Sequence, residues 1–171
     1  MFDIECPVIA PDGDSWSSRE DNLKAVLSLE EALGCSLPQD YRDFLIDYDG
    51  GAPYPQVFQF SPDTDDPDRF LDRLHSAEFA RQLFLERPFG DDVPDGTLII
   101  GEDPGGLQLL LSLRAEDKGR VDALYPTDAS PLVTLADSFR GLLGLLHETE
   151  DGIGFEHWHT PARRANCRKL L

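Results

Sequence analysis

The stretch LPQDYRDFLIDYDGG, from Leu37 to Gly51, is the segment that says most about the fold. Its large apolar residues recur at i, i+3, i+4 and i+7, which places them on one face of a helix: Tyr41, Phe44, Leu45 and Tyr48. Pro38 suits the first helical turn, and Gly50 can take the left-handed conformation that ends a helix. The segment therefore predicts a short helix with one face in the core.

The same helix carries aspartates on the flank beside its apolar face. Asp40, Asp43 and Asp47 lie at spacings where like charges repel by roughly 0.2–0.5 kcal/mol per pair. The helix macrodipole favours a negative charge at the amino-terminal end of a helix but disfavours one near its carboxyl end. Because stability does not explain the cluster, we interpret the flank as a candidate binding surface. Solubility is the alternative for each acid, and helix capping is a further one for Asp40 and Asp49.

The length and charge of the chain narrow the class of protein. We expect 171 residues to form a single domain, 1–171, with a core at about 17–148. The 33 Asp and Glu against 15 Lys and Arg give a net charge of −18, which would repel a phosphate backbone or an anionic membrane. Four bases lie in the last nine residues, so residues 1–162 hold all 33 acids against 11 bases. Nucleic acid and membranes are therefore poor direct partners, and either solubility or a basic protein partner accounts for the acidity.

The cysteines and the start of the chain indicate the compartment. Cys6, Cys35 and Cys167 are odd in number and far apart, which favours neither a disulfide framework nor a zinc site. The first residues, MFDIECPVIA, lack the positive charge of a signal peptide, and no apolar run is long enough for a membrane span. We expect a cytoplasmic protein.

A first helix is expected before the opening stretch. The segment SSREDNLKAVLSLEEALG starts with a capping box from Ser17 to Glu20 and ends at Gly34. Its predicted inward residues are Leu23, Val26, Leu27 and Leu33. The short link to the next helix predicts a helical hairpin on one sheet. The sixteen residues before it are expected to be a loose arm with at most one strand.

The rest of the chain predicts strands, an insertion and a closing helix. Phe58 and Phe60 alternate with a polar residue in an entry strand. Residues 61–96 form a proline-bounded insertion with helical spacing at Phe70, Leu71 and Leu74 and again at Phe79 and Leu83. Residues 97–100, 107–113 and 120–125 are expected to form an antiparallel meander, because turn residues separate them. A helix capped by Thr134, with Leu135 inward, is expected to follow, and residues 149–171 are a tail.

Motifs for catalysis or cofactors are weak in this sequence. GEDPGG lacks the Lys-Ser/Thr of a phosphate loop and precedes a strand instead of a helix. The acids from Asp63 to Asp68 do not fit the EF-hand register, so divalent binding there is a minor alternative. His157 and His159 are two residues apart but lack an evident third ligand. No nucleophile motif such as G-x-S-x-G indicates a member of a Ser-His-Asp catalytic triad. We therefore expect no catalytic residue, no cofactor and no metal.

Three segments in order resemble the SUKH superfamily, which includes a fungal cell-wall synthesis regulator and many bacterial immunity proteins. They are LGCSLPQDYRDFLIDYDGGAPYPQVFQF, LIIGEDPGGLQLLLSLRAEDKGRVDAL and LADSFRGLLGLL. The resemblance covers about Leu23 to Leu146. It departs from the family pattern in the long insertion, 61–96, and in the tail after Glu148.

The resemblance implies an α+β domain, with an N-terminal helical hairpin and a C-terminal helix packed on a mostly antiparallel sheet, and no catalytic residues. Bacterial members mostly act as immunity proteins, each of which blocks a co-encoded toxin, often a nuclease or deaminase. For this chain we predict a cognate toxin with a basic surface, bound by carboxylates that mimic phosphates. The predicted contact residues are Asp40, Asp43, Asp47, Asp63, Asp65, Asp66 and Asp68.

Two other functions stay open from the sequence. The fungal relative suggests a regulatory scaffold for endogenous partners, and an isolated gene would favour it over immunity. A metal hydrolase around His157 and His159 is the third possibility, which metal analysis of the purified protein would test. The sequence does not give the oligomeric state.

Overall fold

A computed structural model of the chain describes residues 7–60, 68–127, 130–148 and 160–170. Its helices are α1 (Arg19–Leu33), α2 (Gln39–Tyr48), α3 (Ala77–Glu86), α4 (Phe139–Leu145) and α6 (Pro161–Asn166), with a 3-10 turn η1 (Gly90–Asp92). Its strands are β1 (Val8–Ala10), β2 (Ala52–Tyr54), β3 (Val57–Gln59), β4 (Asp68–Phe70), β5 (Arg73–Leu74), β6 (Thr97–Glu102), β7 (Gln108–Ser112), β8 (Val121–Leu124), β9 (Val133–Ala136) and β10 (Arg168–Lys169).

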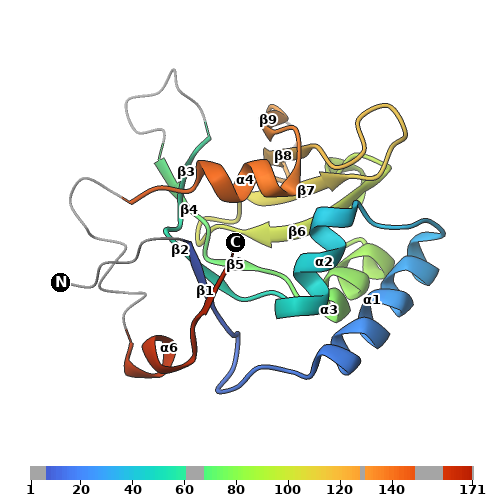
Figure 1. The fold of residues 1–171 in the computed structure, drawn as a ribbon. Helices are drawn as coiled ribbons and strands as arrows, with labels where there is room; N and C mark the ends of the chain where they lie inside the picture. Colours follow the sequence, from blue (N-terminus) through green and yellow to red (C-terminus); the bar gives the residue numbers. More distant parts are fainter. Residues whose placement is uncertain (1–6, 61–67, 128–129, 149–159, 171) are drawn as a thin grey trace.

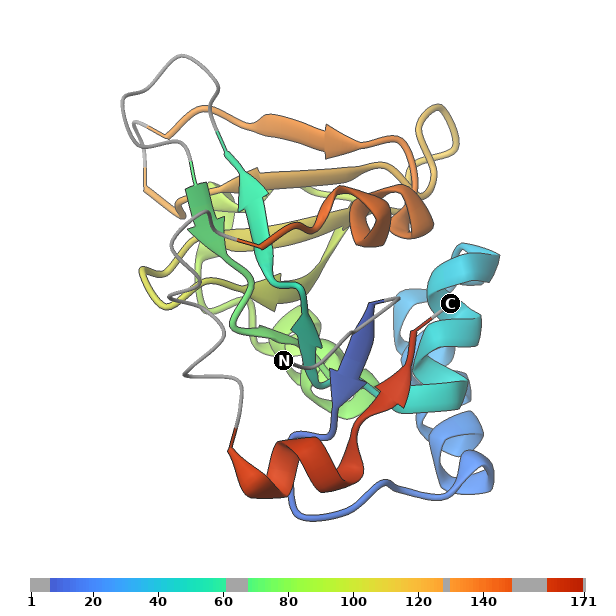
Figure 2. The ribbon, with the colours of Figure 1, turned by 60° about the vertical axis from the view of Figure 1, so that its left-hand side comes forward.

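The strands form three antiparallel sheets. The largest has the order β5-β6-β7-β8-β9, a second has the order β10-β1-β2, and β3 pairs with β4. Strands β6, β7 and β8 are the predicted meander, which is confirmed. Helix α4 lies over one face of the large sheet (Figures 1 and 2). Helices α1, α2 and α3 pack together next to α4 and the sheet. The predicted α+β fold is confirmed.

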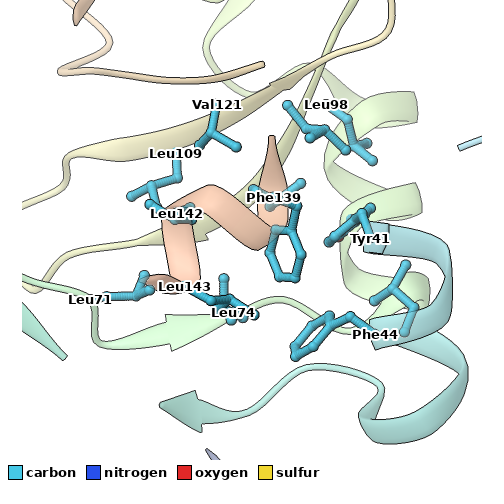
Figure 3. Close-up of a cluster of buried hydrophobic side chains, with 14 of the residues drawn as sticks. Tyr41, Phe44, Leu71, Leu74, Leu98, Leu109, Val121, Phe139, Leu142 and Leu143 are labelled. Atoms are coloured by element: carbon cyan, nitrogen blue, oxygen red, sulfur yellow. The ribbon is translucent and has the colours of Figure 1, made fainter. Parts of the chain in front are cut away.

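The main core lies between the large sheet and the helices. Residues that alternate along β6, β7 and β8 point into it, as the two-residue period of a strand requires: Leu98, Ile100, Leu109, Leu111, Val121 and Ala123. Figure 3 shows Phe139 of α4 among them, next to the rings of α2. Its ring centroid is 5.0 Å from that of Tyr41 and 4.8 Å from that of Phe44. The predicted apolar face of α2 is thus the contact that joins α4 to the helical layer.

The opposite face of the large sheet carries a smaller apolar cluster. Ile99, Leu110 and Leu124 come from β6, β7 and β8. Leu83 of α3 and two residues of the segment after it, Phe89 and Val93, pack against this cluster. The insertion therefore covers part of the second face of the sheet.

The two glycines that follow α2, Gly50 and Gly51, allow β1 and β5 to come close to the end of this helix. Gly50 has φ +89°, and a Cβ there would lie 2.6 Å from the Leu74 carbonyl oxygen. Gly51 has φ +128°, and a Cβ there would overlap the Ala10 carbonyl. The left-handed residue that ends α2 is Asp49, with φ 52°, instead of Gly50 as the sequence suggested. A side chain at either glycine would separate β1 and β5 from the end of α2.

Helix α1 differs from the prediction in its cap and its inward face. The cap is Ser18, which accepts a hydrogen bond from the Asp21 N–H, and not Ser17. Leu23 and Leu27 are 38% and 51% exposed, so their predicted burial is wrong. The buried face is Asn22, Val26 and Leu29, because α1 packs on α2 and α3 along that line.

Three further expectations are corrected in the second half of the chain. The helical spacing around Leu71 and Leu74 is not a helix, since β4 and β5 occupy this segment and pair with β3 and β6. Thr134 is in strand β9, where its hydroxyl donates to the buried Asp122 carboxylate at 2.7 Å. Helix α4 starts later, and Ser138 is its cap.

The two ends of the described chain form a sheet together. The predicted loose arm contains β1, which is buried and lies in the centre of the order β10-β1-β2. Figure 2 shows β1 and β10 side by side. The described end of the tail, through β10, is therefore part of this sheet.

Candidate functional site

The acidic flank of α2 lines a groove between α2 and α4. The groove has a volume of about 170 Å³, and its lining residues are Asp40, Asp43, Phe44, Asp47, Tyr48, Phe139, Arg140, Leu143 and Leu170. The carboxylates form one side of it, because their spacing places them next to the buried stripe of α2. Aromatic and leucine side chains from the core form the floor. The structure thus brings Asp40, Asp43 and Asp47 together at one surface hollow.

Each of the three aspartates also has a contact inside the protein. Asp40 accepts hydrogen bonds from its neighbour's N–H and from the Arg140 N–H, both at 2.9 Å. Asp43 is exposed and accepts from the Gln39 side-chain amide at 2.7 Å. Asp47 pairs with Arg19 at 2.6 Å. The carboxylate of Asp40 thus holds the first turn of α4, whereas Asp43 faces solvent.

Asp49 has a structural role. Its carboxylate accepts a hydrogen bond at 2.9 Å from the Ala77 N–H, at the start of α3. Burial raises the pKa of this carboxyl, and the hydrogen bond from Ala77 opposes that effect. The capping interpretation of this residue agrees with the structure.

Basic side chains lie at one end of the groove. A neighbouring hollow of about 480 Å³ shares Asp47 and Tyr48 with it and is otherwise lined by Ser17, Ser18, Arg19, Arg168 and Lys169. Partial burial raises the pKa of the Tyr48 phenol, and Asp47 raises it further. The surface therefore changes from acidic along α2 to basic where the tail crosses it, which reduces the local negative potential.

The tail is held on this surface by specific contacts. The Tyr48 hydroxyl donates to the Lys169 carbonyl at 2.5 Å, and the Leu170 N–H donates to the Pro7 carbonyl at 2.8 Å. The Arg168 guanidinium lies 4.5 Å from the centre of the Trp16 ring, in cation–π geometry. Leu170 is 5% exposed. Sequence reasoning missed this arrangement, because nothing in the tail's own pattern tells which strand it pairs with.

The remaining predicted contact residues are not part of the groove. Asp68 begins β4, and Figures 1 and 2 place β4 and α2 on opposite sides of α4. Its carboxylate lies 4.0 Å from the His147 imidazole. Asp63, Asp65 and Asp66 lie outside the described residues. The structure therefore groups three of the seven predicted acids and sets Asp68 apart from them.

The structure offers little for metal chemistry in the part of the chain that it describes. No group of three or more His, Cys, Asp and Glu side chains within 7–60, 68–127, 130–148 and 160–170 is placed to hold a metal ion. His157 and His159, which carry the alternative of a metal hydrolase, lie outside those ranges. None of the helices in those ranges has the length and apolar character that crossing a membrane requires.

The comparison with protein families agrees with the resemblance noted from the sequence. The model of the SMI1 / KNR4 family (SUKH-1) matches residues 22–144, from the first turn of α1 to the last turn of α4. The chain belongs to this family. The SUKH-1 match includes the acidic flank of α2 and the insertion, whereas β1, α6 and β10 lie outside it. A comparison with the curated proteins found no significant match.

Proposed function

We propose that this chain is a non-enzymatic immunity protein that binds and neutralises a bacterial toxin with a basic surface, such as a nuclease or a deaminase. Membership of SUKH-1 supports a protein-binding role. The observation that carries the proposal is the groove in which three carboxylates of α2 lie side by side. A net charge of −18 supports a cationic partner.

Electrostatics gives such a surface a clear advantage. Enzymes that act on nucleic acid expose basic clefts, and an acidic inhibitor is steered to them at up to 10⁸–10⁹ M⁻¹s⁻¹ when the salt concentration is low. A fast encounter matters for immunity, because the toxin has to be captured before it reaches its substrate. Carboxylates on a helix are also held more rigidly than those on a loop, which reduces the entropy lost on binding.

The contacts of the three aspartates support different roles for them in the proposed complex. Asp43 is exposed and its partner is a neutral amide, so its charge is available to a toxin. Asp47 shares its charge with Arg19, and Asp40 is engaged at the start of α4. We therefore infer that Asp43 contributes most to toxin binding and that Asp40 is chiefly structural.

The test is growth rescue from a toxin encoded next to this gene. Co-expression of the wild-type chain should restore growth, and Asp43→Lys should reduce the rescue. Glu116→Lys is the matched control, because Glu116 is an exposed acid in the β7–β8 connection and changes the net charge equally. An equal loss of growth rescue in both variants would show that the groove is not the binding surface. A gene with no neighbouring toxin would favour the scaffold role instead.

A further inference from the structure

A separate hollow lies on the insertion, between the end of α3, the η1 turn and the start of β6. We call it the α3–β6 pocket. Its volume is about 260 Å³, and its walls are mainly apolar, with Leu83, Phe84, Phe89, Val93 and Ile99 among them. Several of these side chains also pack on the second face of the large sheet. The floor of the pocket is therefore the surface of a packed cluster.

Hydrogen bonds hold the walls of this pocket in place. The Arg87 N–H donates to the Leu83 carbonyl at 3.0 Å, which ends α3, and the Asp92 N–H donates to the Phe89 carbonyl at 3.1 Å. The Thr97 hydroxyl donates to the Pro94 carbonyl at 2.6 Å, where the segment enters β6. A pocket whose backbone is already ordered loses less conformational entropy when it is filled.

The segment that forms much of the pocket wall is acidic, and its acid Asp95 lines the pocket. Residues 86–96 contain the four acids Glu86, Asp91, Asp92 and Asp95 against one base, Arg87, a local charge of −3. Arg87 lies 3.2 Å from the Asp95 carboxylate and 3.7 Å from that of Asp91. Both carboxylates are more than 90% exposed, so water screens these pairs and most of their charge faces solvent.

The contrast with the groove between α2 and α4 is informative. There the three acids are accompanied by Arg19, Arg140, Arg168 and Lys169, which line the groove or the hollow that adjoins it. At the α3–β6 pocket the lining holds one acid, Asp95, and one base, Arg87, while the segment 86–96 that carries them has four acids against this one base. The pocket therefore combines an apolar recess with an acidic segment beside it, and it lies away from the basic residues of the tail.

We propose that the α3–β6 pocket binds an apolar side chain of a partner protein that is flanked by lysine or arginine residues. Its apolar walls would bury the anchor side chain, and the exposed carboxylates of Asp91 and Asp95 would meet the flanking cations. The inference rests on the proposed function for the identity of the partner, a basic toxin. It adds the place where that partner anchors and the sequence character of the anchor.

A short peptide tests this chemistry without the toxin. The probe is a pentapeptide with one phenylalanine between two pairs of lysines, titrated into the ¹⁵N-labelled full chain and followed by NMR. The matched control peptide has serine in place of phenylalanine. We expect shifts of the Leu83, Val93 and Ile99 amides, with the phenylalanine peptide binding about tenfold tighter because its ring is buried. Replacing Asp91 and Asp95 by Asn should weaken binding at low salt by about threefold.

Several results would overturn the inference. Equal affinity of both peptides would mean attraction by charge alone. Shifts confined to the groove around Asp43 would place the cationic segment there, and shifts that grow with protein concentration in the absence of peptide would show self-association. The two proposals fail separately. Peptide binding without growth rescue would refute immunity and leave the pocket, whereas rescue without peptide binding would do the reverse.

Discussion

His75 provides a quantitative test of the packing around the paired glycines. Its ring is 1% exposed and lies 4.8 Å from the Phe79 ring, and its backbone N–H donates to the Ile100 carbonyl at 2.8 Å. Neither ring nitrogen has a hydrogen-bond partner in the described part of the chain. Burial, with a smaller effect from the charge of Arg73, lowers the pKa of His75 to about 4.

The sign of the pH effect follows from this lowered pKa. The ordinary pKa of histidine is about 6.5, so between pH 6.5 and pH 4 the unfolded chain binds a proton that the folded chain excludes. The contribution of neutral His75 to the free energy of unfolding is therefore full above about pH 6.5, falls with the pH and levels off below about pH 4. From pH 7 to pH 5 the loss is about 2 kcal/mol for pKa values of about 6.5 and 4.

Urea unfolding of the wild type and of His75→Leu at pH 7 and pH 5 measures this effect. Leucine has a similar volume and breaks no side-chain hydrogen bond, so we expect a folded variant with similar stability at pH 7. The wild type should lose about 2 kcal/mol more than the variant on going to pH 5. Carboxylate titration contributes to both chains and cancels in the difference. An equal loss in both would refute the assignment of His75 as a buried neutral imidazole.

Further stability measurements test other parts of the fold. Gly50→Ala should lower the free energy of unfolding by about 2–3 kcal/mol, because φ is +89° and the new Cβ would meet the Leu74 carbonyl. Gly144 in α4 has open space around it, so Gly144→Ala should raise the free energy of unfolding by up to about 1 kcal/mol, as measured by thermal unfolding. Asn22→Ala should lower the free energy of unfolding by about 1–3 kcal/mol, since the Asn22 amide donates to the Ile46 carbonyl at 3.0 Å. Leu27 is half-exposed, so Leu27→Ala should lower it by under about 1 kcal/mol. A larger loss for Leu27→Ala than for Asn22→Ala in urea unfolding would contradict the observed buried face of α1. Leu170→Ala should cost about 2–3 kcal/mol and speed amide exchange in β10 and β1, and unchanged exchange would show that this side chain does not anchor the tail.

Local sequence patterns were sufficient to predict an element where one apolar face decides how that element packs. The stripe of Tyr41, Phe44 and Leu45 predicted α2 and its buried face, because those residues fix the side that leaves water. The meander followed in the same way from apolar runs separated by turn residues. Each helix or strand in these predictions depends on a pattern within its own residues and the turns beside it.

Local patterns failed where a distant partner changes the outcome. Leu23 and Leu27 continue the apolar stripe of α1, yet the buried hydrogen bond from Asn22 to α2 belongs to the face that packs. Thr134 resembles a helix cap, but its pairing with Asp122 in the neighbouring strand keeps it in a sheet. Tertiary contacts of this kind override propensity, and no short window contains them.

The candidate site was predictable only in part. The spacing of Asp40, Asp43 and Asp47 indicated one acidic flank, and the structure places the three in one groove. The bases that accompany them come from α1, α4 and β10 and could not be assigned to it from sequence. The α3–β6 pocket was missed for the same reason, since β6 supplies a wall to residues of the insertion.

The claim that an acidic surface captures a basic toxin is tested most directly by the rate of association. Stopped-flow measurements with the toxin encoded beside this gene would give the association rate constant at increasing salt. Steering between opposite charges predicts a decrease of about tenfold or more between low and physiological ionic strength, while the dissociation rate changes much less. An association rate constant that does not depend on salt would contradict the account.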